Sequence, residues 1–182
     1  MQENKKNWLK YAVLFVASFF VRLIPFRAPN IEPILSIGMP ISKKFGALAS
    51  FSFAFFSIIL YDITTKTLGV WSIWTSITYG LVCLGSTIYF SKKEAKRIEF
   101  VKFAILGTLF YDIITGLAIG PIIFHQNFIE ALIGQIPFTL WHLVGNISFA
   151  AVLSPAIYET LVRKRQTQKS FSIKNLQTKT IS

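Results

Sequence analysis

The chain has 182 residues, of which 53% are hydrophobic and only 15% are charged. Its mean hydropathy of +0.54 excludes an ordinary water-soluble globular domain. Nineteen basic and eight acidic residues give a formal net charge of +11, so the positions of the basic residues decide between a nucleic-acid and a membrane role. The only cysteine, Cys83, excludes an internal disulfide and a cysteine metal cluster.

Six stretches between charged residues are apolar enough to predict transmembrane helices. In chain order they are residues 7–24, 31–42, 45–65, 67–91, about 99–119, and a span within 131–158. The first stretch lacks a signal-peptide cleavage site, so we expect it to be retained. The second stretch has 12 residues, about 18 Å of helix, and contains Pro33, Gly38 and Pro40. A re-entrant or tilted segment is the alternative for it.

The basic residues predict the orientation of these spans. With six spans and a cytoplasmic N-terminus, sixteen of the nineteen basic residues fall on the inner side, and only Arg22, Arg27 and Lys66 on the outer side. Short cytoplasmic loops collect Lys and Arg. We therefore expect an all-α, multi-pass protein of the cell (inner) membrane with both termini inside, and no nucleic-acid partner. Residues 1–165 form the predicted transmembrane domain, and the polar residues 166–182 a disordered, basic cytoplasmic tail.

The chain resembles itself at an offset of 50 residues. Between 53–65 and 103–115, six of thirteen positions are identical, with LYDITT opposite FYDIIT. Both copies fall on spans that run in the same direction, which predicts a parallel structural repeat. Chance similarity between two apolar helices is the alternative. Their helical distances from the inner basic residues Lys44 and Arg97, about 27 Å and 22 Å, place Asp62 and Asp112 in the outer half of the membrane. Asp62 can reach interfacial water there, whereas Asp112 either lines a polar cavity or hydrogen-bonds neighbouring helix ends.

The last span carries a polar stripe of Gln135, Thr139, His142 and Asn146. These residues lie within about 60° of arc on a helix, so we expect the stripe to face the bundle, where it binds other helices or lines a cavity. We favour helix contact for Thr139 and ligand binding for His142 and Asn146. A structural hydrogen bond is the alternative for His142, and no spacing along this helix completes a metal site.

Tryptophans near the predicted outer face have two interpretations. Trp71, Trp74 and Trp141 are typical of an interfacial belt, or they turn inward and stack on a planar ligand.

Catalytic signatures are missing from the sequence. There is no phosphate-binding GxxxxGK[ST] loop, no GxSxG and no HExxH. Two membrane aspartates are also found in intramembrane aspartyl proteases, but the GxGD motif of that family is absent. We expect no enzyme activity, no catalytic residues and no cofactor.

The order of motifs resembles the substrate-binding S components of energy-coupling factor transporters and related small bacterial membrane proteins. The motifs are PNIEP after the first span, a Gly-bearing second span, LYDITT, FYDIITG and QIPFTLWHLVGNISFAAVL, and together they cover residues 8–163. The resemblance implies an outward-facing pocket for a vitamin-like solute, a membrane scaffold subunit and paired ATPases. It implies that two residues roof the pocket and seven line it: Asn30 and Glu32, and Asp62, Trp71, Trp74, Asp112, Trp141, His142 and Asn146.

One departure from that family concerns the scaffold contact. The run of alanines on the first helix of many S components is reduced here to Ala12 and Ala17, which puts that partnership in doubt. The leading hypothesis is a solute-binding subunit for micronutrient uptake that depends on separate ATPases. The alternative is a membrane scaffold of cell-shape or envelope assembly, resembling the rod-shape-determining membrane subunit. Cavity-facing polar residues favour the first, and a filled core with partner-facing grooves favours the second.

Overall fold

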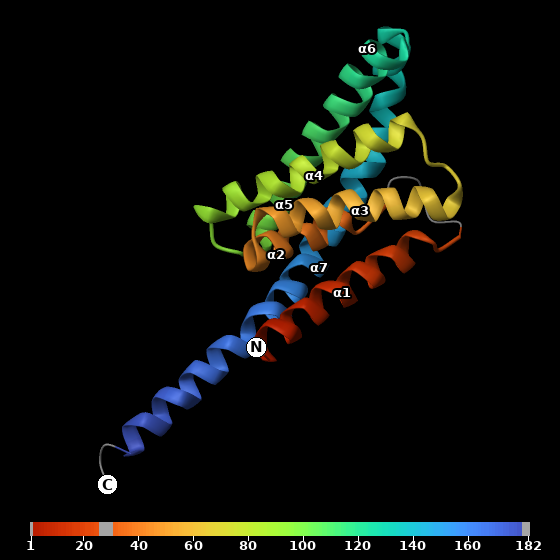
Figure 1. Cartoon of the computed structure of the whole chain (residues 1–182). Helices are drawn as coiled ribbons and strands as arrows, with labels where there is room; N and C mark the ends of the chain where they lie inside the picture. The colour runs from red at the N-terminus through yellow and green to blue at the C-terminus, as the bar shows by residue number, and fades with distance from the viewer. Residues whose placement is uncertain (1, 26–30, 180–182) are drawn as a thin grey trace.

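The computed structural model describes residues 2–25 and 31–179, with side chains for 7–25 and 31–161. All regular structure in these residues is helical, as predicted (Figure 1). In chain order the helices are α1 Gln2–Arg22, α2 Ile34–Phe45, α3 Ala47–Thr65, α4 Val70–Ser91, α5 Arg97–Asp112, the π-helix η1 Ile113–Ile119, α6 Gly120–Phe124 and α7 Phe128–Lys179.

Four helical segments are long and apolar enough to cross a membrane. They are Ala47–Thr65, Val70–Ser91, Arg97–Phe124 and Phe128–Leu161, and they correspond to the last four predicted spans. The third of them joins α5, η1 and α6 into one segment of 28 residues. Within the described residues, α1 and α2 are not among these four, so the count of six spans stays a prediction.

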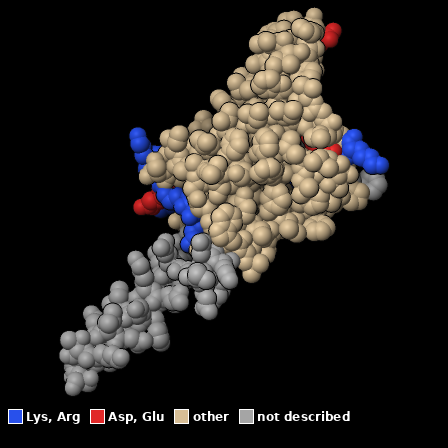
Figure 2. Space-filling view, in the orientation of Figure 1, with Lys and Arg blue, Asp and Glu red and all other residues tan. Residues whose placement is uncertain are grey.

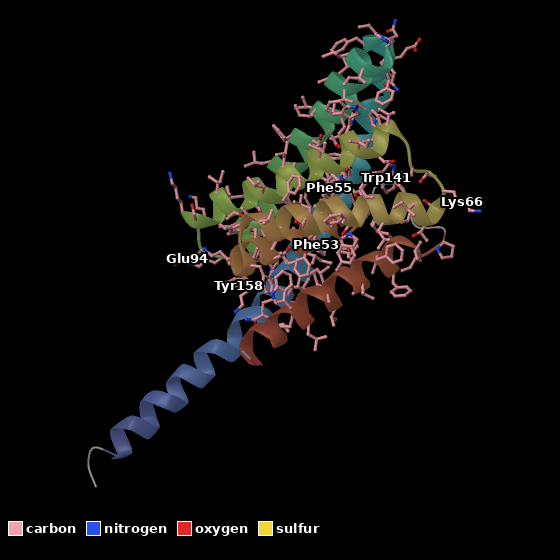
Figure 3. All side chains as sticks on the ribbon, in the orientation of Figure 1. Phe53, Phe55, Lys66, Glu94, Trp141 and Tyr158 are labelled. Atoms are coloured by element: carbon pink, nitrogen blue, oxygen red, sulfur yellow. The ribbon has the colours of Figure 1, made fainter. Side chains whose placement is uncertain are left out.

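The long helices alternate in direction. Helices α3 and α5 run the same way and α4 and α7 run opposite to them (Figure 1), as a parallel repeat on α3 and α5 requires. Lys66, which follows α3, and Glu94, which precedes α5, lie at opposite ends of the bundle (Figure 3). On the face drawn in Figure 2, charged side chains lie at the left and right ends and one acidic group at the upper tip, and the surface between them carries none. This distribution suits a protein that lies across a bilayer.

The short helix α2 is the centre of the bundle. Every residue from Ile34 to Ser42 is buried, and α2 packs against α3, α4, α5 and α7. A helix of 12 residues is too short to span lipid, but irregular backbone is tolerated at membrane depth where protein covers it. The C-terminal end of α2 is held by Lys43, whose ammonium donates to the carbonyl oxygens of Phe90 in α4 and of Lys93 just after it.

A serine of α7 compensates for the proline inside α2. Pro40 has no backbone N–H, so the carbonyl of Ser36, four residues earlier, loses its helical partner. The Ser154 hydroxyl donates to that carbonyl oxygen at 2.7 Å, and both serines are fully buried. Ser50 of α3 similarly donates to the Gly38 carbonyl at 2.9 Å. Side chains of the surrounding helices therefore complete the hydrogen bonding of α2.

Helix boundaries differ from the predicted ones in three places. The segment predicted to begin at residue 31 becomes helical at Ile34, because Pro33 supplies no N–H and starts the turn. The span predicted as one helix to residue 119 changes to a π-helix after Asp112. The backbone of α7 is helical to Lys179, past the predicted domain boundary at 165, and the disordered tail stays a prediction.

The compensation of Pro40 by Ser154 predicts the outcome of a double-mutant cycle. We expect Ser154→Ala to lower the free energy of unfolding by about 1–2 kcal/mol, because the Ser36 carbonyl is left unpaired. In a Pro40→Ala background the same change costs much less, since the N–H of the new alanine can bond Ser36. Denaturation in detergent measures this through exposure of the buried Cys83 thiol to a maleimide dye.

Ser148→Ala is the control, because Ser148 lies on the exposed side of the same helix. Equal costs of Ser154→Ala with and without Pro40 would contradict the compensation.

Candidate functional site

Two polar pairs join α5 to α7 inside the bundle. The Nδ1 of His142 lies 2.8 Å from Oδ1 of Asp112, and the Nδ2 of Asn146 donates to Oγ1 of Thr108 at 2.8 Å. Thr108 lies one helical turn before Asp112 on α5, and Asn146 lies one turn after His142 on α7. The polar stripe of α7 therefore faces two polar residues of α5. All four residues are buried, with exposed fractions of 1–2%. The prediction that this stripe faces the bundle is confirmed for His142 and Asn146.

Aromatic rings enclose these pairs. The rings of Tyr79 and Tyr111 lie 4.7 Å apart, and Tyr111 meets the His142 imidazole at 5.5 Å with nearly perpendicular planes. Phe138 meets the same imidazole at 5.8 Å. Edge-to-face packing at such distances is favourable and holds the imidazole from several sides. We define the polar cluster as Tyr79, Thr108, Tyr111, Asp112, His142 and Asn146.

Four polar atoms of the cluster are buried without a hydrogen-bond partner. They are the Tyr79 hydroxyl, Oδ2 of Asp112, Nε2 of His142 and Oδ1 of Asn146. A buried polar atom left unpaired costs about 1–3 kcal/mol, and most such atoms in proteins are paired. The Tyr79 hydroxyl is within hydrogen-bond reach of the Asn146 side chain, so these two groups can satisfy each other. Oδ2 of Asp112 and Nε2 of His142 then remain buried without a partner among the described residues.

A groove reaches the cluster from the side of α5, η1 and α7. Its volume is about 270 Å³, and its polar wall is formed by Asp112, Gln135 and Thr139. Its other lining residues are Leu109, Ile113, Leu117, Leu132, Ile136 and Leu140. Gln135 donates to Thr139 at 3.1 Å, so Thr139 bonds within its own helix and not to a neighbouring one. A carboxylate at the edge of an apolar groove can bind a donor group of a small molecule.

The π-helix η1 lets α7 come close to the groove. A Cβ added at Gly116 would lie 1.7 Å from Oε1 of Gln135, so the glutamine side chain lies directly against the η1 backbone. A larger side chain at Gly116 would require the Gln135 side chain to move. Single-turn π segments are frequent at functional sites, and this one begins at the residue after Asp112.

An ion pair lies beside the cluster at the end of α1. The Nε of Arg22 lies 3.0 Å from Oε2 of Glu32, with exposed side-chain fractions of 8% and 13%. Arg22 also donates to the Ser57 carbonyl at 2.6 Å and lies 4.2 Å above the Tyr61 ring. The charge of this buried arginine is therefore already matched by a carboxylate, a carbonyl and a ring face.

The two copies of the repeat keep the same helical contacts but have different partners. Thr65 donates to the Tyr61 carbonyl and Thr115 to the Tyr111 carbonyl, each at 2.8 Å. Phe53 and Ala54 are buried, as are Phe103 and Ala104. Arg22 covers Tyr61 in the first copy, whereas His142 contacts Tyr111 in the second. A basic group from another helix therefore lies against the tyrosine of each copy.

The aspartates of the repeat have different surroundings. Asp112 is 1% exposed and bonded to His142. Asp62 is half-buried near the end of α3, where its Oδ1 accepts from the Thr67 hydroxyl at 3.5 Å. The structure thus brings together Asp112, His142 and Asn146 of the predicted pocket residues, and places Asp62 at a helix end.

The tryptophans lie away from the cluster. Trp71 is 41% exposed and packs against the Phe124 ring at 5.1 Å, and Trp141 is 54% exposed (Figure 3). Trp74 is half-buried. Trp141 precedes His142, so about 100° of helical rotation separates the two side chains. Of the predicted roofing residues, Glu32 pairs with Arg22 and Asn30 lies outside the described residues. The substrate-binding roles of all these residues stay predictions.

Sequence reasoning did not assign a site role to Arg22, Tyr79, Thr108 or Tyr111. A site role for Thr108 could have been predicted, because Thr108 lies one turn before Asp112 on the same face of the helix. Tyr111 is part of the repeat, but the sequence predicted no role for it that differs from those of its neighbours. Arg22 counted only as an outer basic residue, although a cation at the end of an apolar helix often has a buried partner.

Comparison of the chain with protein-family models, curated proteins and solved structures finds no match. Among the described residues, no group of three His, Cys, Asp or Glu side chains is placed to hold a metal ion. The site is therefore characterised by its own geometry, which is a buried carboxylate and imidazole pair between aromatic rings with unpaired hydrogen-bonding atoms.

The different surroundings of the repeat aspartates predict different costs of removing them. Asp112→Ala should lower the free energy of unfolding by about 2–4 kcal/mol, because it leaves a buried imidazole without its partner. Asp62→Ala at the half-buried helix end should cost less than about 1 kcal/mol. Denaturant titration of both variants in the same detergent tests this, and equal losses would contradict the assigned roles.

Proposed function

We propose that the chain is a membrane-embedded solute-binding subunit for uptake of a small, vitamin-like micronutrient, and that separate ATPase partners drive the uptake. The observation that carries the proposal is that Oδ2 of Asp112 and Nε2 of His142 are buried in the polar cluster without a hydrogen-bond partner. A purely structural cluster gains nothing from leaving them unpaired in a lipid environment. A bound solute would supply their partners.

The position of the cluster supports entry from outside the cell. Asp112 lies at the end of α5 that points away from the basic segment 92–97, and Glu32 and Arg22 lie near the same end as Lys66. In the proposed topology this is the outer end. The proposal includes six spans with both termini inside, where α1 covers the bundle and the buried α2 acts as a short second span in the cell (inner) membrane.

Partner docking is supported by the outer face of α1. Ala12 and Ala17 are both exposed there, together with the larger Val13 and Val16. Small exposed residues allow close helix packing in membranes, so this face suits a scaffold transmembrane subunit. Two alanines give a shorter small-residue surface than the resemblance implies.

One observation favours the second candidate, a scaffold subunit of cell-shape or envelope assembly. An apolar groove of about 400 Å³ lies between α1 and α7. It is lined by Leu9, Lys10, Val13, Leu14, Ala156, Ile157, Thr160 and Leu161. A partner helix could occupy it without any solute. The two candidates therefore differ in whether the polar cluster binds a small molecule.

The uptake proposal predicts that a small molecule co-purifies with the chain and depends on the cluster. Mass spectrometry of protein purified in mild detergent should detect a solute that is reduced at least about tenfold in His142→Ala, because the variant removes the imidazole that holds Asp112 and the unpaired Nε2 atom. Ser148→Ala, on the exposed side of the same helix, should retain the solute.

A pull-down from the native membrane completes the test. Recovery of ATPase subunits, together with uptake that fails in His142→Ala cells, is the expected result. A chain that carries no solute and recovers only envelope-assembly proteins would favour the scaffold.

The proposed topology predicts the labelling of single cysteines. A Lys66→Cys variant should react with a membrane-impermeant maleimide from outside intact cells, because Lys66 is exposed after α3. Lys93→Cys at the other end should react only after the cells are opened. The natural Cys83 is buried, so the parent protein should not react with the maleimide and serves as the control. Labelling of both positions from the same side would contradict an alternating topology.

A further inference from the structure

We propose that the apolar groove between α1 and α7 binds an acyl chain of an anionic phospholipid, and that the lipid headgroup lies at the basic end of the groove. The inference goes beyond the proposed function, because it names a lipid site and does not use the polar cluster. It follows from the lining of the groove, the order of residues along it, the charges at its end, and its size.

The lining of the groove is almost entirely apolar. Ile157 and Leu161 of α7 are buried, with exposed fractions of 8% and 3%, and form its floor. Val13 of α1 is 58% exposed at its side. Only two of the lining residues, Lys10 and Thr160, are polar. Most of the groove offers no hydrogen bond to an occupant, so it suits a hydrocarbon chain.

The two polar residues lie at the same end of the groove. Helices α1 and α7 run in opposite directions (Figure 1), and the Lys10 ammonium donates to the Thr160 carbonyl oxygen at 3.2 Å. Lys10 and Thr160 are therefore level with each other. Val13 and Ile157 lie about one turn further along the groove on their helices. The groove thus changes from polar to apolar along its length, as a phospholipid does.

Aromatic residues mark the polar end of the groove as the membrane interface. Trp8 is 58% exposed and packs edge-to-face on Tyr11 with ring centroids 5.6 Å apart. Tyr158 is half-buried two residues before Thr160. Trp and Tyr are enriched at the headgroup level of membrane proteins. The polar end of the groove therefore lies where lipid headgroups lie, and its apolar part lies at the level of the acyl chains.

The chain carries a surplus of positive charge at this end. Residues 1–10 and 159–165 contain six basic and two acidic residues. The basic ones are Lys5, Lys6 and Lys10 on α1 and Arg163, Lys164 and Arg165 on α7. Arg163 follows Leu161, the last lining residue, by two positions. Basic residues near a membrane surface attract anionic headgroups, so the charge selects an anionic lipid over a zwitterionic one.

The size of the groove favours an acyl chain over the partner helix of the second candidate function. The lining residues lie within 9–14 on α1 and 156–161 on α7, which is about 9 Å along each helix. A helix of about 10 Å diameter occupies roughly 700 Å³ over that length, whereas the volume of the groove is about 400 Å³. An acyl chain is much narrower than a helix and fits without displacing α1.

Photocrosslinking in nanodiscs tests the proposal. The full chain is reconstituted in phosphatidylcholine with a small fraction of phosphatidylglycerol or phosphatidylcholine that carries the same diazirine acyl chain. Peptide mass spectrometry measures crosslinks to residues 9–14 and 156–161. We expect at least about fivefold more crosslinking with phosphatidylglycerol, the effect of roughly one basic residue near the headgroup. Equal crosslinking by the two lipids means that the groove holds only bulk lipid, and it overturns the proposal.

Two ring-adding variants separate the groove from the rest of the helix surface. Ala156→Phe places a ring in the groove and should reduce the crosslinking of phosphatidylglycerol to that of phosphatidylcholine. Val152→Phe adds a ring one turn earlier on α7, at a position that is 73% exposed and does not line the groove, and should keep the wild-type crosslinking. Undiminished crosslinking in Ala156→Phe, or the same loss in both variants, contradicts binding in the groove.

Two triple variants separate the headgroup site from general attraction. Replacing Arg163, Lys164 and Arg165 with Gln should lower the preference for phosphatidylglycerol to less than about twofold. Replacing Lys169, Lys174 and Lys179 with Gln removes the same charge from the same helix and should keep the preference. These residues begin about 12 Å beyond Leu161, further than the screening length of about 8 Å at physiological salt. Equal losses in the two variants would sink the headgroup assignment.

The remaining outcome concerns a different occupant. If a co-purifying protein shields the groove peptides from both lipids, a partner helix occupies the groove, the inference fails and the scaffold candidate is favoured. None of these measurements depends on the binding of a solute. Failure of the lipid site therefore leaves the uptake proposal to be decided by its own test, and failure of the uptake proposal leaves the lipid site standing.

Discussion

The rest of the site depends on the contact between Asp112 and His142. Two ionisable side chains at 1–2% exposure are tolerated in a lipid-embedded bundle because each supplies the hydrogen bond that the other would lose on leaving water. The pair fixes the rotation of α5 relative to α7 and so brings Thr108 opposite Asn146, one turn further along. It also uses only one oxygen and one nitrogen of its two side chains. The geometry that makes the pair stable therefore also leaves Oδ2 of Asp112 and Nε2 of His142 without a partner.

The helix α2 places this pair at the correct depth. Because α2 is buried from Ile34 to Ser42, the surrounding helices must pack around a core of polar backbone as well as apolar side chains. Ser154 supplies the partner that the Ser36 carbonyl loses to Pro40, and Ser50 bonds the Gly38 carbonyl. Ser154 lies two turns beyond Asn146 on α7, so the contact that holds α7 against α2 also holds the polar stripe at its level. Fold and site share one set of buried hydrogen bonds.

Much of this arrangement could be predicted from sequence, and the failures have physical reasons. The four long spans and the inward direction of His142 and Asn146 follow from helical period and from the cost of polar groups in lipid. Which partner His142 meets does not follow, because period fixes a direction on one helix and says nothing about the helix opposite. The π-helix after Asp112 does not follow either, because hydrophobic period does not distinguish a π-helix from an α-helix over seven residues. The predicted pocket role of Trp141 is not matched by its position, because consecutive residues on a helix point about 100° apart and Trp141 is exposed where His142 is buried.

The repeat shows how identical residues acquire different chemistry. Tyr61 and Tyr111, and Asp62 and Asp112, have the same neighbours in sequence, and both tyrosines lie against a basic group. The second copy continues for more than two further turns through η1 and α6, whereas the first ends at Thr65. Because of that extension Asp112 lies inside the bundle, within reach of α7, and Asp62 lies at a helix end with access to water. Position along the helix, and not residue identity, makes one aspartate a buried partner for His142 and leaves the other half-buried at a helix end.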